Sequence, residues 1–167
     1  MLLVEQTKQK DDPDPKALAC YGILLRWVET DELMIEKMLL RFVEGRPVSD
    51  ITIQFLEWTC QEIEQLGKSV LAMVWDNARW HTSKAVRTWV RAHNQEVKRS
   101  GQGVRILVCF LPVKSPWLNP IEPKWAHGKR RIVEPNATLS KQQLADRVCA
   151  TFDCDHLEHL SIPDNVS

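Results

Sequence analysis

The sequence predicts a mixed α/β fold, and three observations carry that prediction. Two apolar runs, residues 16–27 and 33–43, flank a short polar stretch, as in a β-hairpin. Two further runs, 70–75 and 104–111, are short and almost wholly apolar, which is typical of strands in a buried sheet. Segments with apolar residues at helical spacing precede, separate and follow these two strands. Elements in this order predict a mixed sheet flanked by helices.

The hairpin prediction leaves one alternative open. The stretch 29–32 is polar and acidic, which suits a turn between two strands. The second run, 33–43, is rich in Leu, Met, Glu and Lys, which also favour a helix. Upstream, residues 10–16 are polar and contain two prolines, so a loop is expected there.

The next two elements are a helix and a strand. Ser49 is a candidate N-cap for a helix whose apolar residues continue at helical spacing until Gly67. The strand at 70–75 is apolar at every position, which predicts helices covering both of its faces. Asp76 would then follow an interior strand at its carboxyl end.

Helix boundaries can also be predicted further along the chain. Thr82 or Ser83 can cap a second helix, which Gly101 and Gly103 would end. Pro112 would end the strand at 104–111. A last helix is expected from Ser140 towards residue 152.

Length and charge restrict the classes of function. A chain of 167 residues with 44% hydrophobic content suggests one compact domain, residues 1–167. Its 22 basic and 22 acidic residues give a net charge of zero. The chain as a whole therefore lacks the cationic character of an autonomous nucleic-acid-binding domain, and any binding to DNA must come from local patches.

Cysteine usage and hydropathy bear on the compartment. The five cysteines are odd in number and mostly lie in apolar runs, which favours reduced thiols over a disulfide framework. No apolar run reaches the 18–20 residues of a membrane span, and the first residues do not resemble a signal peptide. We expect a cytoplasmic protein with no membrane partner.

Asp76 and Glu122 are the residues best suited to chemistry. Asp76 follows a strand at the edge of a sheet where α/β proteins gather functional groups, although Asp76-Asn77 could instead only start a turn. Glu122 follows Asn119-Pro120 and precedes Pro123, so it lies within a turn of a helix start, where a purely capping role is the alternative. Separated carboxylates of this kind are the parts of metal-dependent phosphoryl-transfer sites.

At these residues the chain resembles a known family, the DDE transposases of bacterial insertion sequences, in the mariner-like superfamily and its insertion sequence 630 family. The matching segments are Trp75-Asp76-Asn77-Ala78 with His81, Leu111-Pro112, residues 115–122 with Trp125, and the stretches 16–22 and 40–47. The similarity runs from about residue 10 to about residue 152.

The resemblance implies an RNase H-like fold and DNA strand cleavage and strand transfer at transposon ends. It implies two Mg²⁺ or Mn²⁺ ions, with Asp76 matching the second catalytic carboxylate of the family and Glu122 the third. Asn77 and His81 match positions beside that site, where contact with a phosphate is expected.

The chain departs from the family pattern at its start. The family's first catalytic Asp lies on a first strand that is expected to precede this sequence, together with a DNA-binding domain. We therefore expect a truncated catalytic core that is inactive alone and prone to self-association, unless residues 2–4 occupy part of the vacant strand position. Glu5 and Glu36 could substitute for the Asp, but neither stands in the family pattern.

Two other functions remain possible: a non-catalytic regulator that binds intact transposase or DNA, and an unrelated metal-dependent hydrolase that uses Asp76 and His81.

Two further clusters have a functional and a plain interpretation. A basic patch beyond Glu122 could hold phosphates or could be a solvated helix face; its members are Lys124, Lys129, Arg130 and Arg131. A second cluster, Cys149, Cys154, His156 and His159, loosely resembles a zinc site but lacks a CxxC pair, so we expect no zinc there.

Overall fold

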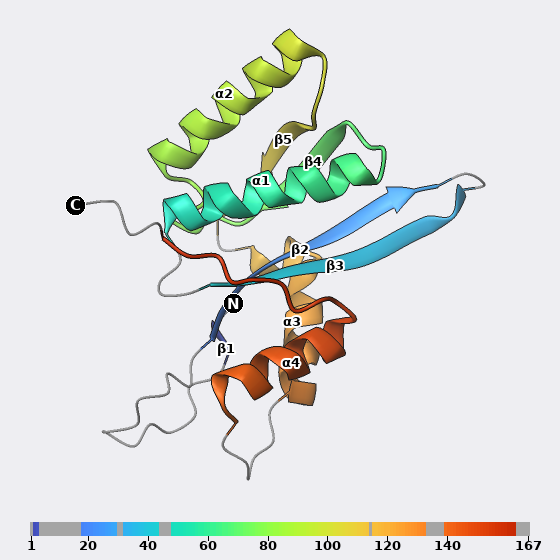
Figure 1. The fold of residues 1–167 in the computed structure, drawn as a ribbon, viewed down its shortest axis with the longest axis vertical. Coiled ribbons are helices and arrows are strands. Elements are labelled where there is room, and N and C mark those ends of the chain that lie inside the picture. The colour runs from blue at the N-terminus through green and yellow to red at the C-terminus, as the bar shows by residue number, and fades with distance from the viewer. Residues whose placement is uncertain are drawn as a thin grey trace. The chain divides into compact units, whose positions relative to one another are not determined.

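The computed structural model describes residues 2–3, 18–29, 32–43, 48–113, 115–132 and 139–162 (Figure 1). The chain divides into two compact units. The hairpin unit comprises Met1–Arg46 and Pro120–Ser161, and the parallel-sheet unit comprises Pro47–Asn119 and Ile162–Ser167. Glu5 and the loop expected at 10–16 lie outside the described residues.

The hairpin unit is built on the predicted β-hairpin. Strand β2 (Leu18–Val28) pairs antiparallel with β3 (Met34–Val43), so the strand alternative at 33–43 is confirmed over the helix. Strand β1 (Leu2–Leu3) pairs antiparallel with the start of β2, on the edge opposite β3. The sheet order is therefore β1-β2-β3.

A segment near residue 160 covers one edge of β3. The Leu160 amide donates to the Phe42 carbonyl at 2.8 Å, and Val43 and Leu160 form a parallel bridge. The Arg41 guanidinium donates to the Glu158 carbonyl through Nε at 3.0 Å and NH2 at 2.7 Å. These contacts satisfy backbone groups that an exposed edge strand would leave unpaired.

Helices α3 (Ile121–Ile132) and α4 (Lys141–Phe152) complete the hairpin unit. Ser140 caps α4 in a full capping box with Gln143, which confirms the predicted start. The core formed by the two strands and these helices consists of Leu18, Cys20, Met38, Leu40, Phe42, Trp125, Ile132, Leu139, Leu144, Ala145, Val148 and Cys149.

Two glycines allow close approach inside this core. A Cβ built on Gly22 of β2 would lie 2.4 Å from the Trp125 ring of α3. A Cβ on Gly128 of α3 would lie 2.3 Å from the Phe152 ring of α4. Since real Cβ contacts are essentially never that short, both glycines are required by packing.

The parallel-sheet unit contains α1 (Ser49–Gln65), β4 (Val70–Trp75), α2 (Lys84–Ser100) and β5 (Arg105–Phe110). Strands β4 and β5 are parallel, with Trp75 opposite Phe110 at their carboxyl ends. Asn94 of α2 binds the outer edge of β5, because its side-chain amide donates to the Ile106 carbonyl and accepts from the Ile106 amide, both at 2.8 Å. Together the two units form a mixed α/β structure consistent with an RNase H-like fold.

Two predictions for this unit are wrong. Val48, not Ser49, occupies the N-cap position of α1, and the Ser49 hydroxyl instead donates to the Ser83 hydroxyl at 2.8 Å. Strand β4 is not buried on both faces: its residues alternate, so Leu71, Met73 and Trp75 are buried while Val70 and Val74 are about half exposed. An apolar run alone does not reveal which faces other elements cover.

The other helix boundaries in this unit agree with the sequence. Ser83 caps α2 by accepting from the Val86 amide, and Gly101 follows the helix in the left-handed conformation at φ 70°. Gly67, two residues beyond α1, also has positive φ. Glycine adopts this conformation without the steric cost of a Cβ, which explains both stops.

Candidate functional site

Asp76 lies immediately beyond β4, where β4 and β5 end side by side. The Leu111 amide donates to the Trp75 carbonyl at 2.9 Å, which extends the strand pairing by one step. The Asn77 side chain donates from Nδ2 to the Leu111 carbonyl at 2.7 Å. Asn77 therefore fixes the loop after β4 to the loop after β5, and so restrains the backbone that carries Asp76.

One oxygen of the Asp76 carboxylate is held from two sides. Oδ1 accepts from the Ala78 amide at 3.0 Å and from His81 Nδ1 at 2.7 Å. The hydrogen bond from His81 is the main cause that lowers the pKa of Asp76, and the Ala78 amide adds to it against the opposing effect of burial. The side chain is 48% exposed, and Oδ2 has no hydrogen-bond partner among the described residues.

His81 is held more firmly than a surface histidine. Its side chain is only 14% exposed, and its ring centroid lies 4.8 Å from that of Trp75 and 5.8 Å from that of Trp80. Because a carboxylate only accepts hydrogen bonds, His81 must donate from Nδ1 to Asp76. The turn at 76–81 creates this bond, which the spacing of the residues in the sequence did not reveal. The phosphate contact expected for His81 stays a prediction.

Glu122 is the second residue of α3 and is exposed to solvent. The helix begins at Ile121, one residue after Pro120, so Pro120 precedes the helix and Pro123 lies within its first turn. Proline is tolerated there because amides of the first turn have no partner within the helix. Within the described parts of the chain, no hydrogen bond or ion pair engages the Glu122 carboxylate.

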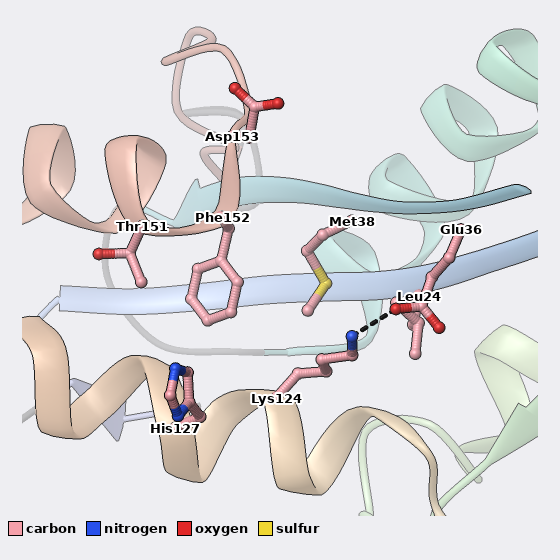
Figure 2. A pocket seen from close by; sticks show the side chains of 8 residues that line it. All are labelled: Leu24, Glu36, Met38, Lys124, His127, Thr151, Phe152 and Asp153. Atoms are coloured by element: carbon pink, nitrogen blue, oxygen red, sulfur yellow. Dashed lines mark ion pairs between the residues drawn. The ribbon is translucent and has the colours of Figure 1, made fainter.

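Glu36 lies between two cations in the hairpin unit. Its Oε1 pairs with Lys124 Nζ and its Oε2 with Arg26 Nε at 2.8 Å. Figure 2 shows the Lys124 side chain directed at Glu36. Both residues line a pocket of about 470 Å³, together with Leu24 and Met38. Lys124, then Arg26, lower the pKa of Glu36. Both carboxylate oxygens of Glu36 are thus paired, which argues against Glu36 as a substitute metal ligand. Lys124, a member of the predicted basic patch, is paired with Glu36 as well.

The remaining members of the predicted basic patch lie in the last turn of α3. These are Lys129, Arg130 and Arg131, of which the two arginines are exposed. Cations at a helix C-terminus interact favourably with the helix dipole, so their position has a structural explanation in addition to any contact with phosphate.

The histidines among the candidate zinc ligands contact other side chains near the end of the chain. None of the five cysteines, all of which lie in described parts of the chain, forms a disulfide, and burial raises the pKa of Cys20 and of Cys154 to about 12 each. His156 Nδ1 lies 3.0 Å from Asp146 Oδ1, and His156 Nε2 lies 3.3 Å from His159 Nε2. No group of three or more metal-binding side chains is found in the part of the chain that the structure describes.

Asp76 and Glu122 belong to different units, so their convergence on one cation stays a prediction. Asn77 and His81 lie with Asp76 in the parallel-sheet unit, whereas the basic patch lies with Glu122 in the hairpin unit.

The chain belongs to the DDE superfamily endonucleases, because the model of that family matches residues 36–145. The match includes both Asp76 and Glu122. No curated protein matches the chain. None of the described helices combines the length and apolar character needed to cross a bilayer.

Proposed function

We propose that the protein is a catalytic core of the mariner-like, insertion-sequence transposase type and that it provides two of the three carboxylates used for DNA strand cleavage and joining at transposon ends. The family match supports endonuclease-type chemistry on DNA. The observation that carries the proposal furthest is the Asp76 carboxylate at the end of a strand, which is ionised, is oriented by His81 and has one oxygen that no described residue engages.

The donor set fits a hard divalent cation. Asp76 offers Oδ2, and Glu122 offers a carboxylate that no described side chain engages. Mg²⁺ and Mn²⁺ prefer carboxylate oxygens, and we assign Asp76 and Glu122 as ligands of the family's two-metal site. Divalent cations held by Asp76 and Glu122 would supply activation of the attacking oxygen and stabilisation of the leaving oxygen at phosphorus.

The surrounding residues have distinct parts in this proposal. His81 keeps Asp76 ionised and holds its Oδ1, while Asn77 holds the loops after β4 and β5 together. Water attacks the phosphodiester first and the bond to the 3′-oxygen breaks, which leaves a 3′-hydroxyl. That hydroxyl then attacks a phosphodiester of the target strand, whose bond from phosphorus to the 3′-oxygen breaks, so the two strands are joined and a 3′-hydroxyl of the target strand is released.

Metal binding tests the proposal without requiring turnover. We expect Mn²⁺ titration calorimetry to show binding that Asp76→Asn and Glu122→Gln each weaken at least tenfold, as loss of a carboxylate ligand should. Asp155→Asn is the control, because Asp155 is an exposed aspartate of the hairpin unit outside the proposed site. If neither substitution changed Mn²⁺ affinity, the assignment of Asp76 and Glu122 would be wrong.

Cleavage tests the completeness of the site. The family uses three carboxylates and two are assigned in this chain, so we expect little Mg²⁺- or Mn²⁺-dependent nicking of supercoiled DNA by this chain alone. Robust nicking abolished by Asp76→Ala would show that the chain supplies a third ligand of its own. DNA binding without any metal binding would instead favour a non-catalytic regulator.

A further inference from the structure

Helix α2 concentrates positive charge on one side. Lys84, Arg87, Arg91 and Lys98 are spaced at i, i+3, i+7 and i+14 along this helix. At about 100° per residue, these positions fall within an arc of about 60° around the helix axis. We call these four residues the α2 stripe. At about 1.5 Å per residue the stripe is about 21 Å long.

The α2 stripe is exposed, and no described acidic side chain neutralises its charge. All four residues are exposed, and none of their side chains makes a hydrogen bond or ion pair with the described residues. The helix contains one carboxylate, Glu96, and it pairs with Arg99 through two hydrogen bonds of 2.6 and 2.9 Å. The stripe is thus a local cationic surface on a chain of zero net charge.

The rest of α2 anchors the stripe rigidly. Val86 is buried, and His93 and Asn94 bind the backbone of the β5 strand and the residue before it, at Val104 and Ile106. The α2 N-terminus is capped by Ser83, two residues after His81, which binds Asp76. One end of the stripe therefore lies close in the chain to the candidate catalytic carboxylate.

From these observations we infer that the α2 stripe binds the phosphate backbone of the duplex DNA on which the Asp76 site acts. This inference rests on the proposed function for the identity of the ligand. At 3.4 Å per base pair along the duplex axis, a stripe of about 21 Å is about as long as six base pairs, so its four cations can face phosphates along the edge of a groove. None of the large apolar side chains exposed among the described residues lies on α2, so the surface does not suit insertion into a membrane.

The α2 stripe is better suited to this task than the predicted basic patch on α3. In that patch Lys124 is paired with Glu36, and the other three cations crowd into one helical turn. The stripe instead presents along its length four cations that pair with no described residue. Phosphates repeat along a strand, so an extended row of charges contacts more of them than a compact cluster does.

Salt-dependent DNA binding tests the inference. Fluorescence anisotropy with a 30-base-pair duplex would be measured in EDTA at several salt concentrations, with the variant Lys84→Gln/Arg87→Gln/Arg91→Gln/Lys98→Gln. Each lost phosphate contact should reduce the slope of log K against log salt by about 0.9, so we expect a reduction of about 3.6. The four positions are exposed and glutamine favours helices, so the variant should fold, which thermal unfolding would check.

Matched variants make the outcome specific. Glu96→Gln/Arg99→Gln removes a neutralised pair from the same helix and should leave the slope unchanged. Lys129→Gln/Arg130→Gln/Arg131→Gln tests the rival patch. Asp155→Asn, at an exposed position of the hairpin unit, should also leave the slope unchanged. A reduced slope in the α2 variant alone would support DNA binding by the α2 stripe, even if calorimetry detected no metal binding that depends on Asp76.

Several results would contradict DNA binding by the α2 stripe: an unchanged slope in the α2 variant, loss of the whole slope in the α3 variant, or no duplex binding by the wild type. Binding to phosphatidylserine vesicles in place of DNA would also overturn it.

Discussion

The two units of this protein each contain one of the two predicted catalytic carboxylates, but they hold them differently. In the parallel-sheet unit, Asp76 is fixed by His81 and by the Ala78 amide, and its pKa is lowered. In the hairpin unit, Glu122 extends from the first turn of α3, with no bond to a described side chain. One carboxylate is held in place and the other is not, and preorganisation reduces the entropic cost of binding.

The two units also differ in how tightly apolar side chains are covered. The core of the hairpin unit is so tightly packed that it requires glycine at two contacts, Gly22 and Gly128. The parallel-sheet unit leaves apolar side chains half exposed on its strands; these are Val70, Val74, Leu107 and Phe110. Its distinctive stabilising contacts are polar, above all the binding of β5 by Asn94. Close packing against glycine distinguishes the hairpin unit, and side-chain binding of a strand edge distinguishes the parallel-sheet unit, which also buries apolar residues such as Leu56 and Ile106.

The largest effect is expected from Gly22→Ala in the hairpin unit. The added Cβ would meet the Trp125 ring at 2.4 Å, so β2 and α3 must move apart. We expect a loss of about 3 kcal/mol in the free energy of unfolding, at the upper end for overpacked cores. Gly67→Ala is the contrasting control, since nothing lies within 4 Å of its Cβ position and only the positive φ opposes it.

Hydrogen exchange would locate the Gly22→Ala effect. Lost protection should be confined to the hairpin unit, in β2, β3, α3 and α4. An equal loss in β4 and β5 would mean that the two units unfold together, and the contrast between their cores would lose its meaning.

Asn94→Ala should destabilise the parallel-sheet unit by about 2 kcal/mol. The substitution leaves the amide and carbonyl of Ile106 without their side-chain partners, and unsatisfied backbone groups are costly. Chemical denaturation together with hydrogen exchange in β5 would measure the loss. Gln95→Ala is the matched control, because Gln95 is the exposed neighbour on the same helix. A cost below that of Gln95→Ala would contradict the importance of this contact.

His81→Gln tests the preorganisation of Asp76. His81 is the main cause of the lowered pKa of Asp76, so its removal should raise that pKa towards the ordinary carboxyl value. Loss of such an orienting partner typically weakens metal affinity about 10- to 100-fold. Carbon NMR of the Asp76 carboxyl and Mn²⁺ calorimetry would measure the two effects. An unchanged pKa would show that the Ala78 amide alone suffices.

The sign of the pH dependence follows from the same bond. Because the folded-state pKa of Asp76 is lowered, the bond stabilises the fold at pH values above the ordinary carboxyl pKa. This stabilisation is lost as the pH falls through the lowered pKa. The stability difference between wild type and His81→Gln should therefore shrink on acidification.

Ser140→Ala should have the smallest effect, about 1 kcal/mol, because it removes the N-cap of α4. Thermal unfolding would measure the loss. Ser140→Asp retains a capping oxygen and should recover most of the stability. If both substitutions were equally destabilising, the capping box would not be the reason for the effect.

Local signals in the sequence determined most of the secondary structure. The hairpin, the caps at Ser83 and Ser140 and the stop at Gly101 each depend on residues near one another in the chain, so periodicity and capping preferences suffice to predict them. The position of Asp76 after a strand was predicted for the same reason.

Only the tertiary structure decided which side chains meet. Glu36 pairs with Lys124 from a distant helix, Gly22 accommodates Trp125, and Ser49 bonds Ser83 in place of capping its own helix. The half-exposed face of β4 belongs to this group as well, since burial depends on neighbouring elements. Propensities act over a few residues, whereas these contacts depend on how whole elements pack, which no short stretch of the chain encodes by itself.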